Sequence, residues 1–192
     1  MNLLTNLLIN SLTDPVTNPA KNLVKRTLVA GVGNVFFGDD GFGSEVARRL
    51  AARSLPEGVS VTDFGIRGVH LAFELSSGYD DAIVIDAVAR GGEPGTLYVI
   101  APELGGLSGL GQGGAAVAPD AHGINLDAVF AMTLTLGAAP GRVRVIGCEA
   151  KEVVDRIGLS APVEGAVERA IALLITMLAD GARPGAVEEV GR

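Results

Sequence analysis

The sequence predicts an α/β fold, a three-layer sandwich in which a largely parallel five-stranded sheet has helices on both faces. From Thr27 onward, short apolar segments alternate with segments of helical periodicity. A strand that is followed by a helix and then by another strand needs a crossover connection, which favours parallel pairing. The strand segments are also apolar at successive positions, as is typical of strands that are covered on both sides.

Five segments have the composition of strands. Each is short, rich in valine, isoleucine or other apolar residues, and flanked on at least one side by glycine, proline, aspartate or asparagine. The expected strands are Thr27–Val32, Val59–Phe64, Ala82–Ala87, Thr96–Ile100 and Arg142–Gly147.

Four segments have the periodicity of helices. They are Gly41–Arg53, Gly68–Ser76, Gly123–Thr135 and Pro162–Ala179. In the last, apolar residues recur every three or four positions and form one stripe, made up of Val163, Ala166, Val167, Ala170, Leu173, Leu174, Met177 and Leu178. Ser160 is expected to cap the start of this helix, and Pro162 fits its first turn.

The domain is expected to span residues 27–180, between an extension and a tail. Residues 1–26 predict a short amphipathic helix and a linker, which fits either a partner-docking segment or an over-extended gene start. They lack the basic region and small-residue cleavage site of a signal peptide. Residues 181–192 are expected to be a flexible tail. The glycine-rich segment Ala101–Ala121 predicts a mobile loop of the kind that often covers a site.

Composition excludes several classes of protein. The chain has 192 residues and a formal charge of −7, with no stripe of lysine and arginine, which argues against binding nucleic acid. Its single cysteine, Cys148, excludes an intramolecular disulfide and a CxxC motif. No apolar run approaches the roughly 18 residues of a membrane span. We therefore expect a soluble, cytoplasmic protein, and a monomer.

Polar residues follow the expected strands at their carboxyl ends, where α/β sheets form their sites. They are Asn34, Asp39, Asp40, Asp63, Arg67, Asp86, His122, Cys148 and Glu149. One histidine and two carboxylates at this rim fit a three-ligand site for a divalent metal, with open positions for water or substrate. Imidazole and carboxylate ligands suit zinc or nickel.

Each candidate also has a purely structural interpretation. Asp40 precedes a helix and fits a helix cap, and Asp86 fits a turn after its strand. His122 fits a loop or cap residue. His70 is expected to be a partly exposed histidine on a helix, and Cys148 a small buried residue.

A dinucleotide site is the rival interpretation of the first loop. Gly31-Val32-Gly33 follows a strand, and Asp63 ends the next strand, where a ribose-binding acid would lie. Phe36, however, occupies the place of the third glycine. Asp39 and Asp40 would repel a pyrophosphate at the helix start. The loop therefore favours a cation over a phosphate.

Five segments, in order, resemble successive blocks of the [NiFe]-hydrogenase maturation endopeptidases. They are "GVGNVFFGDDGFG", "VTDFGIRGVHLAFEL", "AIVIDAVARGGEPGTLYVI", "DAHGINLDAVF" and "VIGCEAKEVVDRIGLSAPVEGAVERAI". The resemblance covers nearly all of Thr27 to Ala179. It implies a five-stranded sheet between helices and a cytoplasmic enzyme, a metal-dependent hydrolase. Such an enzyme removes the C-terminal extension of a hydrogenase large-subunit precursor after nickel has entered that subunit.

The resemblance also implies a set of site residues. Asp40, Asp86 and His122 would bind the nickel that the precursor carries, and in the isolated protein other divalent ions could bind at the site when added. A water on or near the metal would be the nucleophile. The residues expected to contact the substrate are Asp39, Gly65, Arg67 and Gly68.

Two other functions stay open on the sequence alone. The first is a chaperone that checks nickel in the precursor without cutting it. The second is a nucleotide-binding oxidoreductase.

Overall fold

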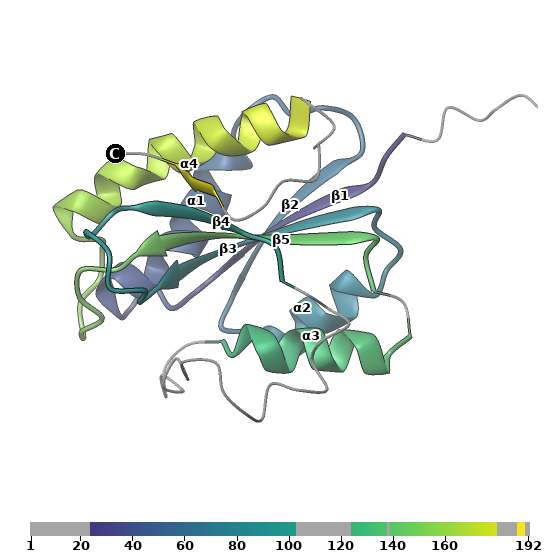
Figure 1. The fold of residues 1–192 in the computed structure, drawn as a ribbon, viewed down its shortest axis with the longest axis horizontal. Helices are drawn as coiled ribbons and strands as arrows, with labels where there is room; N and C mark the ends of the chain where they lie inside the picture. The colour runs from purple at the N-terminus through teal and green to yellow at the C-terminus, as the bar shows by residue number, and fades with distance from the viewer. Residues whose placement is uncertain (1–23, 103–123, 138, 180–187, 191–192) are drawn as a thin grey trace, which may run out of the picture.

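The computed structural model describes residues 24–102, 124–137, 139–179 and 188–190, and its centre is a sheet with the strand order β2-β1-β3-β5-β4-β6 (Figure 1). The strands are β1 (Thr27–Val32), β2 (Val59–Gly65), β3 (Asp81–Val88), β4 (Leu97–Ile100), β5 (Arg142–Glu149) and β6 (Glu188–Val190). β1 pairs in parallel with β2 and β3, and β3 with β5, whereas β4 is antiparallel to β5 and β6.

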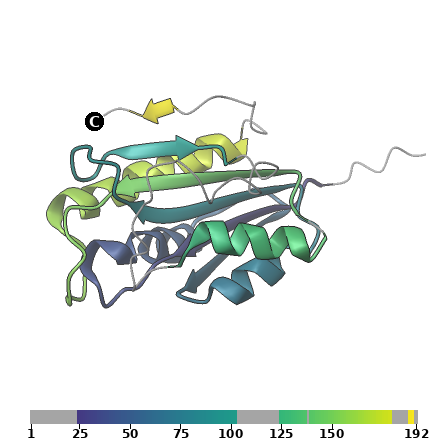
Figure 2. The same ribbon diagram turned by 60° about the horizontal axis from the view of Figure 1, so that its bottom comes forward.

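The five expected strands are confirmed, and the sheet has one strand more. β6 lies in the segment expected to be a flexible tail, and it pairs with Leu97–Val99 of β4 at the outer edge of the sheet (Figure 2). This pairing satisfies backbone groups that an edge strand would otherwise expose. The expectation of a flexible tail therefore does not describe residues 188–190.

Helices cover both faces of the sheet, with α1 and α4 on one side and α2 and α3 on the other (Figure 1). They are the 3₁₀ turn η1 (Gly38–Gly41), α1 (Phe42–Leu50), α2 (Gly68–Leu75), α3 (Leu126–Thr135) and α4 (Ala161–Ala179). α3 begins three residues later than expected because the Asn125 side chain accepts a hydrogen bond from Ala128 N (3.1 Å) and caps the helix there. None of the helices described is long and apolar enough to cross a bilayer.

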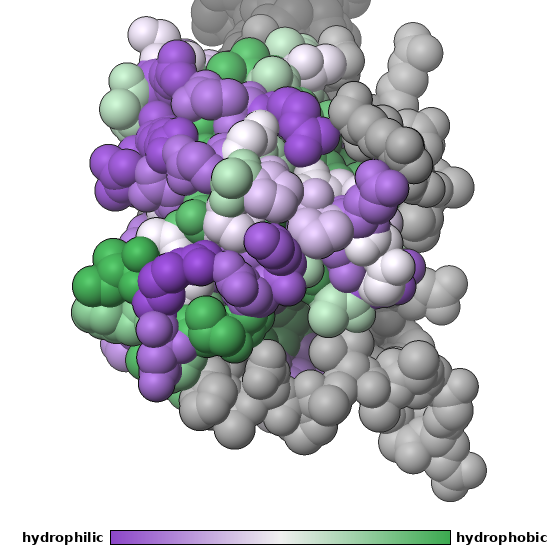
Figure 3. Space-filling view, turned by 90° about the vertical axis from the view of Figure 1, so that its left-hand side faces the viewer, coloured by the Kyte–Doolittle hydropathy of each residue, from purple (hydrophilic) through white to green (hydrophobic). Residues whose placement is uncertain are grey.

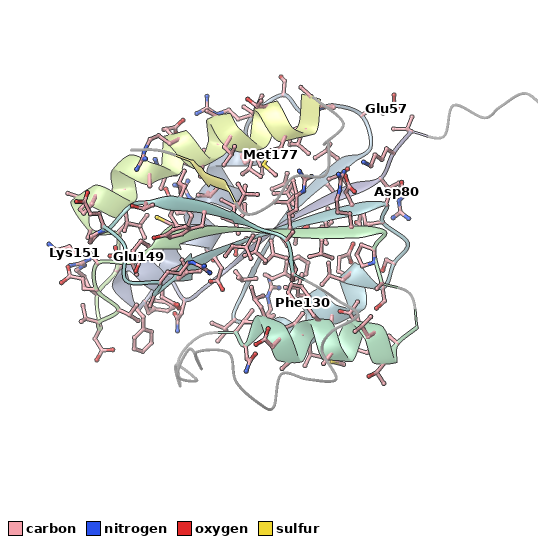
Figure 4. The ribbon with its side chains drawn as sticks, viewed as in Figure 1. Glu57, Asp80, Phe130, Glu149, Lys151 and Met177 are labelled. Atoms are coloured by element: carbon pink, nitrogen blue, oxygen red, sulfur yellow. The ribbon has the colours of Figure 1, made fainter. Side chains whose placement is uncertain are left out.

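Two hydrophobic clusters fill the space on either side of the sheet. Met177 of α4 packs against one and Phe130 of α3 belongs to the other, approaching the sheet from opposite faces (Figure 4). The expected stripe of α4 is confirmed, since its members are buried or partly buried. The three layers thus follow from apolar stripes packed on both sides of apolar strands.

Glycine lets α1 rest directly on the ends of two strands. A Cβ atom on Gly43 would collide with the carbonyl oxygens of Ile85 in β3 and Val32 in β1. A Cβ atom on Gly31 would likewise collide with Gly43 O. This close approach fixes η1, the turn just before α1, beside the carboxyl end of β3.

The residues just before β1 already make long-range polar contacts. Lys25 Nζ lies 2.6 Å from Asp81 Oδ2, and Arg26 N donates to Asp80 Oδ2 over 2.8 Å. The folded unit therefore includes Lys25 and Arg26, which the sequence had placed in the extension.

Candidate functional site

The carboxyl ends of β1, β2, β3 and β5 meet at one edge of the sheet, as expected for parallel strands. This edge lies on the left in Figure 1 and faces the viewer in Figure 3. Glu149, at the end of β5, and Lys151 lie at this edge in Figure 4, whereas Glu57 and Asp80 lie at the opposite one. Most polar candidates from the sequence belong to the elements that end here.

Asp40 is held at this edge by η1. The residue is only 9% exposed, and its Oδ2 atom accepts a hydrogen bond from Asn34 N over 2.7 Å. Gly33 makes room for it, because a Cβ at that position would collide with Asp40 O. The loop after β1 therefore folds back and fixes the carboxylate.

Asp86 approaches Asp40 from the end of β3. Burial and, next, the negative charge of Asp40 raise the pKa of the Asp86 carboxyl well above its usual value. Its Oδ1 atom accepts one hydrogen bond, from Ala87 N over 2.9 Å. Within the described part of the chain, no lysine or arginine forms an ion pair with Asp86.

These two carboxylates fit a divalent cation. The charge of Asp40 disfavours the ionised form of Asp86, and a cation between them would reverse that penalty. The third expected ligand, His122, lies outside the described residues. Among the residues that are described, no group of three histidine, cysteine or acidic side chains is arranged to hold a metal. The structure thus brings together two of the three expected ligands.

Asp39, expected to contact substrate, is instead buried inside the protein. It is fully enclosed, and burial alone would raise its pKa, but hydrogen bonds from Ser160, Glu152 and Lys151 hold the pKa below its ordinary value. Ser160 donates through its amide (2.6 Å) and its hydroxyl (2.8 Å), and Lys151 N and Glu152 N donate over 2.8 and 3.1 Å. In this conformation Asp39 therefore has a structural role, because it joins η1 to the loop before α4.

Ser160 takes part in this junction and also occupies the expected position at the start of α4. It directly precedes the helix, and its carbonyl oxygen accepts from Glu164 N over 2.8 Å. Its hydroxyl donates to Asp39, a contact that was not expected. The sequence carried no signal for this pairing, since the two residues are 121 positions apart.

The residues after β2 form the second side of the edge. Asp63 accepts from the Ser44 hydroxyl (2.8 Å) and from Gly65 N (2.9 Å), so its carboxylate already joins β2 to α1. The Arg67 guanidinium donates to the carbonyl oxygens of Phe64 and Asp63. Gly68 faces α3, where a Cβ would press on Ile124 and Val129 at 3.2 Å. Arg67 stays exposed to solvent, and the expected substrate contacts of Gly65, Arg67 and Gly68 remain predictions.

The remaining candidates have structural environments. Cys148 is buried, and burial raises the pKa of its thiol to about 12, so it is a poor nucleophile. Glu149 is buried too, and accepts from Arg90 N, Gly91 N and the Tyr98 hydroxyl, which shapes the connection between β3 and β4. His70 lies exposed on α2, as expected.

Comparison with known proteins identifies one family. The sequence profile of the hydrogenase maturation proteases (HycI) matches residues 44–177. Hydrogenase expression/formation protein HupD of Rhizobium leguminosarum is 31% identical over 159 residues, or 80% of this chain and 74% of HupD. The hydrogenase 2 maturation peptidase of a Thaumarchaeota archaeon is 35% identical with a TM-score of 0.62, over 81% of this chain and 99% of its own. The endopeptidase HybD of Escherichia coli has the same fold, with a TM-score of 0.66 at 24% identity over 85% of this chain and 95% of its own.

Proposed function

Since the chain belongs to the hydrogenase maturation protease family, we infer that it is a hydrolase, an endopeptidase that processes the C-terminus of a hydrogenase large-subunit precursor. The observation that links this function to a site is that Asp40 lies near Asp86 at the carboxyl end of the sheet and contributes to the raised pKa of Asp86. α/β proteins bind their ligands at this end. A carboxylate whose charge is disfavoured by burial and by a second carboxylate favours a cationic partner there.

We propose that this cationic partner is the nickel ion carried by the precursor. Asp40 and Asp86, together with His122, would hold the ion while the rest of its coordination comes from the precursor. A site of three protein ligands with open positions suits an ion that arrives with the substrate. The enzyme then acts on a precursor only after nickel is in place. The isolated protein would bind added divalent ions weakly.

The chemical step is hydrolysis of one peptide bond. We propose that a water molecule is the nucleophile, because the one cysteine of the chain, Cys148, is buried and its pKa is raised. The water oxygen adds to the carbonyl carbon, the C–N bond breaks, and the leaving amine takes a proton. The two products are the shortened large subunit and a free C-terminal peptide.

The location and the state of association are also proposals. We expect a cytoplasmic monomer that meets its precursor before the hydrogenase is assembled. Size-exclusion chromatography with light scattering on the purified protein would test the monomer.

The proposed function is tested by incubating the purified protein with precursor that carries nickel and with precursor that lacks it. We expect a C-terminal peptide, detected by mass spectrometry, from the nickel-loaded precursor alone. A complex without a released peptide would instead indicate the nickel-checking chaperone. An oxidoreductase would show a thermal shift with NAD(P), which we do not expect because Asp63, the candidate ribose ligand, already binds Ser44 and Gly65.

A further inference from the structure

Apolar side chains gather at the edge of the sheet beside Asp40, although this edge faces solvent. They come from the loop between β1 and η1 and from the loop between β5 and α4. The exposed fractions are 44% for Val35, 63% for Phe36, 46% for Val154 and 75% for Ile157. We call these four residues the apolar platform. On this face of the molecule, hydrophobic side chains lie among hydrophilic ones (Figure 3).

The two loops of the apolar platform are fixed to each other. Arg156 N donates to Phe36 O over 3.0 Å, and Gly38 N donates to Arg156 O over 2.7 Å, so that Phe37 and Arg156 form a short parallel bridge. Beneath the bridge, the Asp39 carboxylate holds the amides of Lys151 and Glu152. The exposed side chains therefore stand on a preorganised backbone, which lowers the entropic cost of binding a partner.

The apolar platform is continuous with the carboxylates of the proposed nickel site. Val35 and Phe36 directly follow Asn34, whose amide donates to Asp40. On the other side, Val154 and Ile157 lie in the loop held by Asp39, the neighbour of Asp40 in η1. The loops that carry the apolar platform are therefore bonded directly to the turn that carries Asp40, so a polypeptide that presents a metal ion to Asp40 would lie close to this surface.

We propose that the apolar platform binds an apolar segment of the precursor polypeptide, next to the nickel that the two aspartates hold. The inference rests on the proposed function and names what recognises the protein part of the substrate. None of the four side chains carries a charge, so the matching segment is apolar, and burying it removes exposed apolar surface from water on both partners. Carboxylates would then recognise the metal, while the platform recognises the chain around it.

The experiment uses the full-length protein and its large-subunit precursor, with and without nickel. Phe36→Ser and Ile157→Ser remove the two most exposed platform side chains. Phe73→Ser on α2 and Ile175→Ser on α4 are matched controls, since these side chains are 55% and 43% exposed and lie outside the platform. Cleavage kinetics are measured on nickel-loaded precursor, and the Kd is measured on nickel-free precursor by biolayer interferometry.

We expect each platform variant to raise KM about tenfold, the effect of losing one buried apolar side chain, with kcat within about twofold of wild type. The Kd for nickel-free precursor should rise by a similar factor, because apolar contact does not require the metal. The controls should match wild type in both measurements.

Three results separate the possibilities. If the wild-type protein cleaves and the platform variants keep its KM and Kd, the platform inference is wrong while the proposed function stands. If the wild-type protein does not cleave, the proposed function fails, and the Kd values still decide whether the platform binds the precursor. If sedimentation shows a wild-type dimer that Phe36→Ser or Ile157→Ser dissociates, the surface joins two copies of the chain and the inference is overturned.

Discussion

The amide and the hydroxyl of Ser160 both donate to the carboxylate of Asp39, which lies 121 positions earlier in the chain, over 2.6 and 2.8 Å. The same carboxylate accepts from Lys151 N and Glu152 N. It therefore ties the start of α4 and the preceding loop to η1, the turn that carries Asp40. The position of the proposed nickel ligand depends on this buried, charged junction.

Asp39→Asn should destabilise the protein although the two side chains have nearly the same shape. The amide group of asparagine would place a donor against backbone donors, and we expect a loss of about 2–3 kcal/mol in the free energy of unfolding. Urea denaturation at pH 7 measures this, with exposed Asp155→Asn as the control. Because the pKa of Asp39 is lowered on folding, its contribution is present above the unfolded value of about 3.9 and is lost as pH falls through the folded value. The difference between wild type and Asp39→Asn should therefore shrink in acid.

Asp86→Asn should abolish processing and at the same time stabilise the metal-free protein. The raised pKa means that folding disfavours the Asp86 carboxylate. The penalty is absent below the unfolded pKa of about 3.9, grows as pH rises toward the folded pKa, and is complete above it. At pH 7 to 8 we expect the free energy of unfolding to rise by about 1–3 kcal/mol. Each kcal/mol should raise Tm by about 2–4 °C. The gain should disappear near pH 4.

A double-mutant cycle tests whether Asp40 causes part of this penalty. In an Asp40→Asn background, Asp86→Asn should stabilise less, because one of the two interacting charges is already gone. Calorimetry on protein treated with a chelator gives the Tm values. An unchanged gain would mean that burial alone raises the pKa of Asp86.

Much of the fold was predictable because each layer buries a continuous apolar surface. β1 has the bounds Thr27–Val32 that its composition indicated. The antiparallel direction of β4 was missed, although the sequence carries a signal for it. Only residues 89–96 connect β3 to β4, and a parallel crossover needs about a dozen or more. β6 had no comparable signal, because three residues that pair at an edge lack a recognisable period.

The site was predictable only in part, since neighbouring residues of the same type receive opposite roles. Asp39 and Asp40 are adjacent and chemically identical in the sequence. The structure aims Asp39 at backbone amides of the loop before α4 and places Asp40 beside Asp86. Which aspartate faces which partner depends on contacts more than 100 positions away in the chain. Strand position alone was enough to predict that Asp86 lies near the carboxyl end of β3, whereas its role as a ligand stays a prediction.

Gly43→Ala should destabilise the protein and also displace η1, the turn that carries Asp40 and directly precedes α1. Its Cβ would collide with two backbone oxygens that have no room to move, so we expect a loss of about 3 kcal/mol or more. Gly165→Ala in α4 is the control, because nothing lies within 4 Å of its Cβ position, and it should stabilise by about 0.5–1 kcal/mol. Urea denaturation measures both. A Gly43→Ala protein of wild-type stability would show that α1 can shift away from β1 and β3.

The two histidines should behave differently in a processing assay. His70→Ala removes an exposed side chain of α2 and should leave the rate of precursor cleavage near wild type. His122→Ala should abolish cleavage if His122 is the third ligand of the precursor's nickel, as we propose from the family resemblance. The faster migration of the shortened large subunit on a denaturing gel measures processing of nickel-loaded precursor. An inactive His70→Ala together with an active His122→Ala would overturn the ligand assignment.

A protein that starts at Val24 should fold and process precursor at close to the full-length rate. It keeps Lys25, which pairs with the buried Asp81 at 2.6 Å, and Arg26, which donates to Asp80 and lies over the Tyr79 ring at 4.6 Å. Removing residues 1–23 should therefore cost about 1 kcal/mol or less in urea denaturation.

A protein that starts at Thr27 is the matched comparison. Its free energy of unfolding should fall by a further amount on the order of 2 kcal/mol, because Asp81 loses Lys25 and Asp80 loses Arg26 as a partner. If the protein that starts at Val24 aggregates, the leucines of the extension cover core surface. If it stays folded but no longer cleaves, the extension docks the precursor.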